Sequence, residues 1–155
     1  QPWRVIVVQD ADTKAKLTEA AFGQTQVGSA SAVFVIYTDM TDSLANLDQV
    51  IHPGFGDKAP GVKAGIEKHF SSYSPDDVVQ WGRAQGYTFM AFLLLAAEAM
   101  GYGTSPMLGF NPAAVRELLG LPDHAYLPAL VSIGVPAEEG FPHYRHELDR
   151  FVTWK

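Results

Sequence analysis

Four consecutive residues near the middle of the chain could offer backbone hydrogen-bond donors to a ligand. Pro106-Met107-Leu108-Gly109 follow a long apolar helical stretch and lie in a strand-like segment just before a capped helix. Two exposed backbone N–H groups at such a place can hold the polar edge of a flat ring. Gly109 favours such a contact because a residue without a side chain lets a ligand approach the backbone closely. Taken alone, the same four residues are more typical of a simple turn at the end of a strand.

Signatures of several other chemistries are missing from the sequence. No Gly-x-Gly-x-x-Gly follows a strand-like run, and no phosphate-loop lysine motif is present. The five histidines lack the spacing of metal ligands, so no metal is expected. The absence of cysteine excludes thiolate ligands and a cysteine nucleophile. Ser71-Ser72-Tyr73-Ser74 lacks the Gly-x-Ser-x-Gly context of a serine nucleophile and is more typical of a helix cap and a loop.

The composition indicates a small acidic globular protein. The 155 residues carry a net charge of −6, which argues against a broad nucleic-acid surface. The longest apolar run, Phe89 to Ala97, is well short of the roughly 20 residues that span a membrane. No linker or repeat divides the chain, so we expect a single domain over 1–155. The lack of cysteine and of a visible secretion signal favours a cytoplasmic protein without a membrane partner.

Apolar and β-branched runs predict the strands that would position the central segment. We expect strands at 3–9, 32–38, 104–110 and 127–135, and a strand-like end at 151–154 that needs a partner sheet. The strand at 3–9 should be buried on both faces. Since helical segments alternate with these strands, the sequence predicts an α+β chain with a sheet packed between helices.

Capping residues and helix-stopping residues predict where the helices lie. The first expected helix starts after a cap at Asp10 or Asp12, runs through 17–22 and stops at Gly23; the others are 62–70, 74–100 and 112–119. Proline and glycine interrupt the region 41–73, so we expect a loop there ahead of the helix at 62–70. The half-helix Tyr87–Ala97 is apolar on every side, which predicts that protein surrounds it and that it could also form a subunit contact.

Three stretches in chain order carry a resemblance to a known family. Gln1-Pro2-Trp3-Arg4-Val5-Ile6-Val7-Val8 opens the chain, Pro106–Gly109 lies in its middle, and Pro142-His143-Tyr144-Arg145 with Phe151-Val152-Thr153-Trp154 closes it. Together they resemble the FMN-dependent nitroreductase family over nearly the whole chain. The resemblance implies an α+β fold with a central, mostly antiparallel sheet, flanking helices and a long buried central helix. It also implies a homodimer with FMN at the interface, and hydride transfer from NAD(P)H to the flavin and then to an acceptor.

The resemblance also implies roles for the residues of the central segment and of the tail. Leu108 and Gly109 would donate their N–H groups to the N5 and O4 edge of the flavin, and Pro106 and Met107 would pack against the ring. The family's Lys-x-Arg pair, which grips the FMN phosphate, corresponds here to His143 and Arg145. Arg145 suits the role because the guanidinium fork donates two hydrogen bonds to a phosphate. The alternative for it is a solvated loop arginine. His143 departs from the family pattern, because histidine is only partly charged at neutral pH.

Two glutamines complete the set of expected cofactor contacts. By the same resemblance, Gln85 occupies a position from which the second subunit reaches the cofactor; a helix-surface glutamine is the alternative. Gln24, between the first helix and the second strand, would contact the pyrimidine edge of the ring. Trp3 matches the family's Gln-Pro-Trp stretch and is expected to be structural.

The front of the chain departs most from the family. Family members begin about fifty residues earlier, with an Arg-x-Ser segment whose arginine binds phosphate, and we expect the natural protein to carry such a segment. The resulting hypothesis is an FMN-dependent oxidoreductase with a ping-pong mechanism, with 41–73 as part of a substrate lid and a nitroaromatic, quinone or similar acceptor. The alternative is a non-catalytic dimeric module that keeps the fold but binds flavin weakly or not at all.

Overall fold

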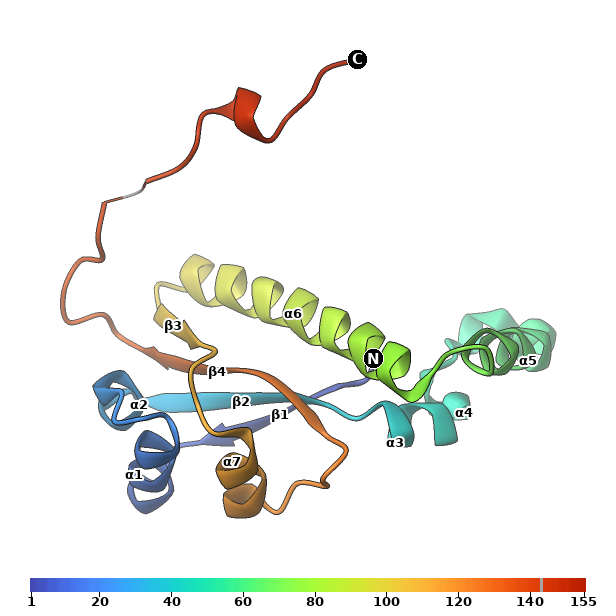
Figure 1. Cartoon of the computed structure of the whole chain (residues 1–155), viewed down its shortest axis with the longest axis horizontal. Helices are drawn as coiled ribbons and strands as arrows, with labels where there is room; N and C mark the ends of the chain where they lie inside the picture. The colour runs from blue at the N-terminus through green and yellow to red at the C-terminus, as the bar shows by residue number, and fades with distance from the viewer. Residues whose placement is uncertain (143) are drawn as a thin grey trace.

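The computed structural model describes residues 1–142 and 144–155 and contains one four-stranded antiparallel sheet (Figure 1). The strands lie in the order β1-β2-β4-β3, and all neighbouring pairs are antiparallel. The strands are β1 (Trp3–Val8), β2 (Ala32–Thr38), β3 (Gly103–Met107) and β4 (Tyr126–Gly134). The expected α+β class with an antiparallel sheet is therefore confirmed.

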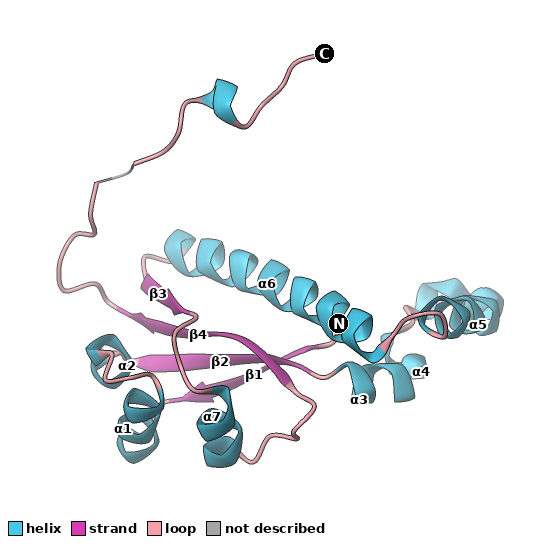
Figure 2. Ribbon diagram, in the orientation of Figure 1, coloured by secondary structure: helices cyan, strands magenta, loops and turns pink. Residues whose placement is uncertain are grey.

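Helices cover both faces of this sheet (Figure 2). The helices are α1 (Ala11–Ala20), α2 (Thr25–Ser29), α3 (Met40–Ala45), α4 (Leu47–Val50), α5 (Ala59–Phe70), α6 (Pro75–Ala99) and α7 (Pro112–Leu119), with 3₁₀ segments η1 (Pro53–Lys58) and η2 (Leu148–Arg150). The long helix α6 crosses one face, while α1, α2 and α7 lie against the other, and α3 to α5 extend beyond the end of the sheet.

The main core lies between the sheet and the helices α1, α2 and α7. Its centre is formed by fully buried aliphatic side chains: Leu17, Val27, Val33, Val35, Val115 and Leu130. Because side chains alternate across a strand, Val33 and Val35 face this core, while Thr38 of the same strand faces α6, where its methyl group approaches Gly86. The sheet is thereby fixed between two helical layers.

Local caps start the helices where the sequence placed them. The Asp10 carboxylate accepts the Thr13 N–H at 2.7 Å ahead of α1. Ser74 and Asp77 form a reciprocal capping box at α6. Asn111 caps α7, so the helix starts at 10, 74 and 111 are confirmed.

Proline lies in the sheet only where a missing N–H is tolerated. Pro106 is on β3, an edge strand. Pro128 lies on the inner strand β4, at the irregularity in pairing between Ile36 and Thr38 of β2. Both positions agree with the confinement of proline to edges and bulges.

The expected helix at 62–70 is present as α5, but the loop expected ahead of it is wrong, because most of that stretch is helical. Asp39 accepts the Asp42 N–H at 2.8 Å and so starts α3, and η1 and α5 follow α4 closely. Pro53 and Pro60 lie in the first turns of η1 and α5, where a helix leaves N–H groups unbonded in any case. These prolines begin helices instead of breaking one.

Three expectations about burial and pairing also need correction. β1 is an edge strand and is only half-buried, because β2 is its one neighbour in the sheet. The half-helix Tyr87–Ala97 is covered on one side only: Phe92 and Leu95 are 69% and 68% exposed. Residues 151–154 form no strand, since the tail after β4 runs away from the sheet (Figure 1).

Within the described residues, no helix combines the length and the apolar character needed to cross a bilayer.

Candidate functional site

The segment Pro106–Gly109 leaves the sheet at its midpoint. Pro106 pairs with Val131 and Met107 with Leu130, and the ladder ends there. The Met107 side chain is 4% exposed and belongs to the core, whereas Pro106 is exposed on the opposite face of the strand. In this chain, therefore, the Pro106 ring and not the Met107 side chain is open to an incoming molecule.

Leu108 and Gly109 lie just beyond the last ladder pair. Among the turn and loop bonds of the described chain, neither N–H donates to a backbone carbonyl. Leu108 is 62% exposed. A Cβ placed on Gly109 would meet nothing closer than the Gln24 side-chain nitrogen, at 4.0 Å. Two donors with open space beside them are suited to the polar edge of a flat ligand.

The structure brings Gln24 to this segment. Its Nε2 donates to the Gly109 carbonyl at 2.7 Å and to the Ala21 carbonyl at 3.0 Å. The Asn111 N–H donates to the Ala20 carbonyl at 2.8 Å. The end of α1 and the loop before α7 are therefore joined by a side-chain bond and a backbone bond.

Gln85 lies elsewhere in the single chain. It is half-buried on α6, and no hydrogen bond joins its side chain to another described residue. The adjacent Gly86 contacts Pro128 of β4, so Gln85 lies close to the α6 surface that packs on the sheet.

Arg145 lies in the tail that follows β4. It is exposed, and its Nη1 donates to the carbonyl of neighbouring Tyr144 at 2.9 Å. In Figure 1 this tail extends away from the sheet and its helices. The other expected phosphate ligand, His143, lies outside the described residues.

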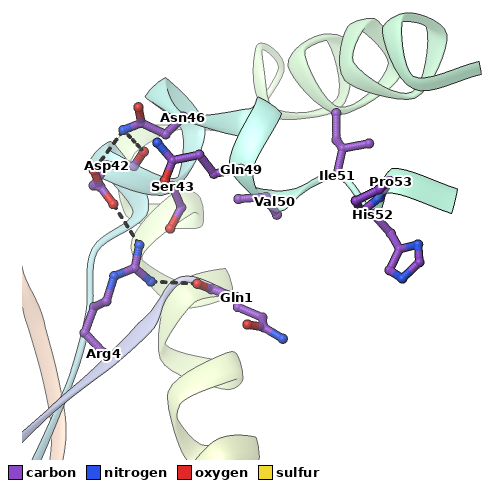
Figure 3. Close-up of a pocket in the computed structure, with 10 residues that line it drawn as sticks. All are labelled: Gln1, Arg4, Asp42, Ser43, Asn46, Gln49, Val50, Ile51, His52 and Pro53. Carbon is purple, nitrogen blue, oxygen red and sulfur yellow. Dashed lines mark hydrogen bonds and ion pairs between the residues drawn. The ribbon is translucent and has the colours of Figure 1, made fainter. Parts of the chain in front are cut away.

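A cavity of about 350 Å³ lies at the start of β1, beside α3 and α4 (Figure 3). The Arg4 guanidinium at its wall is already engaged: it contacts Asp42 at 2.7 Å and donates to the Gln1 carbonyl at 2.8 Å. Asn46 Nδ2 also donates to the Asp42 carboxylate, at 2.9 Å. Sequence reasoning missed this cavity, since it forms where β1 meets a region expected to be a loop.

A second polar cluster lies where α6 meets β4. Burial and the neighbouring Tyr87 hydroxyl raise the pKa of Tyr126, and the Arg83 guanidinium lies 5.6 Å from the ring centres of both tyrosines. His124 Nε2 lies 3.1 Å from an Asp39 carboxylate oxygen. Among the described residues, no group of three acidic, histidine or cysteine side chains could hold a metal ion.

Trp3 joins the edge of the sheet to the long helix. Its ring stacks on Phe89 of α6, with ring centres 4.2 Å apart and an interplanar angle of 17°. This stacking gives Trp3 a packing role in the structure.

Comparisons with known proteins agree with this architecture. The nitroreductase family profile matches residues 1–135. An NADH dehydrogenase of Thermus thermophilus is 49% identical over 156 residues, which cover 100% of this chain and 76% of the relative. A Bacillus subtilis protein assigned as an NAD(P)H nitroreductase is 32% identical over 163 residues, covering 100% of this chain and 78% of the relative.

A solved structure shows the same fold. A protein of Exiguobacterium sibiricum, described as a nitroreductase in complex with FMN, superposes with a TM-score of 0.88 at 27% identity; the match covers 99% of this chain and 77% of the other. The family profile spans the whole sheet, from β1 to β4, together with the segment 106–109. Because that match and a relative almost half identical over the full chain agree, the protein belongs to the nitroreductase family.

Proposed function

We propose that this protein is an FMN-dependent oxidoreductase that uses NAD(P)H and works by a ping-pong mechanism. The proposal is supported by family membership, by relatives named as an NADH dehydrogenase and an NAD(P)H nitroreductase, and by the related structure in complex with FMN. Bound FMN would supply the redox chemistry, taking a hydride from NAD(P)H and delivering it to a second substrate. The protein's own residues would bind and orient the cofactor.

One structural observation carries the proposal most directly: two backbone amides just beyond the end of β3 have no backbone acceptor among the described turn and loop bonds. The N–H groups of Leu108 and Gly109 would donate to the N5 and O4 edge of the ring, and Pro106 would pack beside it. The fit is supported by the open space next to Gly109 and by the absence of backbone acceptors for these donors in the described turns and loops. Donors held at a ring edge stabilise negative charge that develops there.

The remaining contacts would come from the tail and from a second copy of the chain. Arg145, with His143, would bind the FMN phosphate, and Gln85 would reach the cofactor from the partner subunit. We therefore propose a homodimer with FMN at the subunit interface. In support, Phe92 and Leu95 on α6 and Met100 just after it expose large apolar side chains, at 69%, 68% and 72%. Exposed apolar patches of this kind mark protein interaction surfaces.

The acceptor would be a small molecule that reaches the exposed flavin face. Nitroaromatics, quinones and similar oxidants fit such a site, since the proposed chemistry needs no acid or base from a side chain. The helices α3 to α5 extend beyond the end of the sheet and would form part of a substrate lid (Figure 2).

Absorption spectroscopy of the purified protein tests this function. We expect a flavin band in the visible range, loss of that band on anaerobic addition of NADH or NADPH, and its return on addition of a quinone or nitroaromatic. A colourless protein that stays free of flavin in excess FMN would instead favour the non-catalytic dimeric module. Comparison of bleaching rates with the two nicotinamides would give the preferred donor.

A further inference from the structure

The Gly109 carbonyl is held by a side chain that lies 85 residues earlier in the chain, that of Gln24. The Gln24 Nε2 donates to this carbonyl at 2.7 Å and to the Ala21 carbonyl at 3.0 Å. A primary amide has two N–H donors, so both are used within the protein. The Gln24 Oε1 in turn accepts from Gln26 Nε2 at 3.3 Å. The side chain thus has little capacity left for donating to a ligand.

The turn that presents Gln24 has an unusual backbone. Phe22 has a φ of 56° and Gly23 a φ of 78°. The left-handed region is unfavourable for phenylalanine, and burial does not compensate, because the Phe22 side chain is 72% exposed. The turn is held by backbone bonds, among them Gly23 N–H to Thr18 at 2.9 Å and Gln24 N–H to Ala21 at 3.2 Å. A strained non-glycine residue beside a binding segment suggests that the turn has a function there.

A second bond fixes the other end of the same loop. The Asn111 N–H donates to the Ala20 carbonyl at 2.8 Å, and the Asn111 side chain caps α7. The loop between β3 and α7 is therefore tied to the end of α1 at Gly109 and again at Asn111. Glycine has the greatest backbone freedom of any residue, so a bond to the Gly109 carbonyl removes freedom where the loop has most of it.

We infer that Gln24 is a positioning residue. By holding the Gly109 carbonyl, it keeps the N–H groups of Leu108 and Gly109 in the orientation that the flavin ring edge requires. The identity of the ligand rests on the proposed function, but the restraint on the loop exists in the protein without flavin. This role differs from a direct contact of Gln24 with the pyrimidine edge, because its two donors already bond to carbonyls.

Hydrogen exchange in flavin-free protein tests the restraint on the loop. Gln24→Met keeps the side-chain length but removes both donors, and Gln24→Glu places a carboxylate against two carbonyl oxygens. We expect each variant to speed exchange of the Asn111 N–H by about fivefold, which corresponds to one net hydrogen bond. Gln80→Met, on the exposed side of α6, is the matched control and should leave this rate unchanged.

FMN titration of the same variants tests the consequence for the ligand. Each Gln24 variant should raise the Kd for FMN by about fivefold and shift the visible absorption band of bound flavin, because donors at the ring edge move. A merely structural role would weaken binding without altering the spectrum of the flavin that still binds.

The two measurements separate failure of this inference from failure of the proposed function. If exchange of the Asn111 N–H is unchanged in both Gln24 variants, the loop is not held by Gln24 and the inference is overturned. Faster exchange with an unaltered FMN Kd and spectrum also overturns it, since the restraint would then not serve the flavin. If the unmodified protein binds no FMN, the proposed function fails even where the exchange result supports the restraint.

Discussion

The close packing of α6 on the sheet depends on two glycines of the helix, Gly82 and Gly86. The substitution Gly86→Ala tests this packing. A Cβ added at Gly86 would lie 2.8 Å from the Pro128 ring and 3.0 Å from the Thr38 methyl carbon. Neither neighbour can move easily: Pro128 is a ring in an inner strand, and Thr38 is β-branched and 2% exposed. Gln85 is adjacent, so a displaced helix would also move a proposed cofactor contact.

The expected change in the stability of the Gly86→Ala variant follows from two opposing effects. Alanine in place of glycine inside a helix stabilises it by about 1 kcal/mol. Overpacking of a well-filled interface costs about 1 to 3 kcal/mol. Gly65 in α5 isolates the first effect, because a Cβ there would meet nothing within 4 Å. Gly65→Ala should therefore only gain stability from helix propensity. Gly86→Ala should gain the same amount but also lose stability through overpacking.

Thermal unfolding at matched protein and FMN concentrations measures the difference in stability between the two variants. For a chain of this size, 1 kcal/mol corresponds to about 2 to 4 °C. Gly65→Ala should raise Tm by about that amount, and Gly86→Ala should melt about 2 to 12 °C below Gly65→Ala. Gly82→Ala should fall between them, because its nearest neighbour, at 2.7 Å, is the flexible Met40 side chain. If Gly86→Ala stabilises the protein as much as Gly65→Ala, the close seating of α6 is refuted.

Three other outcomes are expected. Arg145→Ala should weaken FMN binding about tenfold in a fluorescence titration, as expected for loss of a charged hydrogen bond, while Arg150→Ala on the same tail should not; equal Kd values would remove Arg145 from the site. Leu95→Asp should convert the proposed dimer to a monomer in light scattering, because it places a charge on the apolar face of α6, and an unchanged dimer mass would place the interface elsewhere. Hydrogen bonds from the Thr13 side chain and N–H lower the pKa of Asp10 in the folded protein. The stabilisation by the ionised Asp10 cap should therefore be complete above about pH 4 and be lost as the pH falls through the lowered pKa of the folded protein. Asp10→Asn, which retains a capping side chain but does not titrate, should therefore change Tm relative to the unmodified protein at pH 7 and less at low pH; an equal change at both pH values would contradict this.

Features stabilised by neighbours in the sequence could be predicted without the structure. The helix starts at Asp10, Ser74 and Asn111 depend on hydrogen bonds that span two or three residues. The buried strand β2 could be recognised from its unbroken apolar run. The stretch between residue 41 and the helix at 62–70 was predicted wrongly for a local reason. A proline inside a helix interrupts it, but Pro53 and Pro60 lie in first turns, where proline begins a helix.

The candidate site could be predicted only in part. Resemblance pointed to Leu108 and Gly109, but their place beyond the last rung of the ladder depends on the β3–β4 register. The contact of Gln24 with Gly109 links residues that no local pattern connects. The uncovered apolar face of α6 was likewise hidden, because composition shows that a helix is apolar but not which of its sides the rest of the chain covers.

The sequence by itself determined the helix starts at Asp10, Ser74 and Asn111, the buried strand β2, the α+β class and the family to which the protein belongs. Only the tertiary structure decided that β1 is an edge strand, that Met107 points into the core, and that Gln24 holds the loop after β3. The reason is the range of the forces involved. Caps and apolar periodicity act over a few residues, whereas strand order and register bring distant residues together only once the whole sheet has formed.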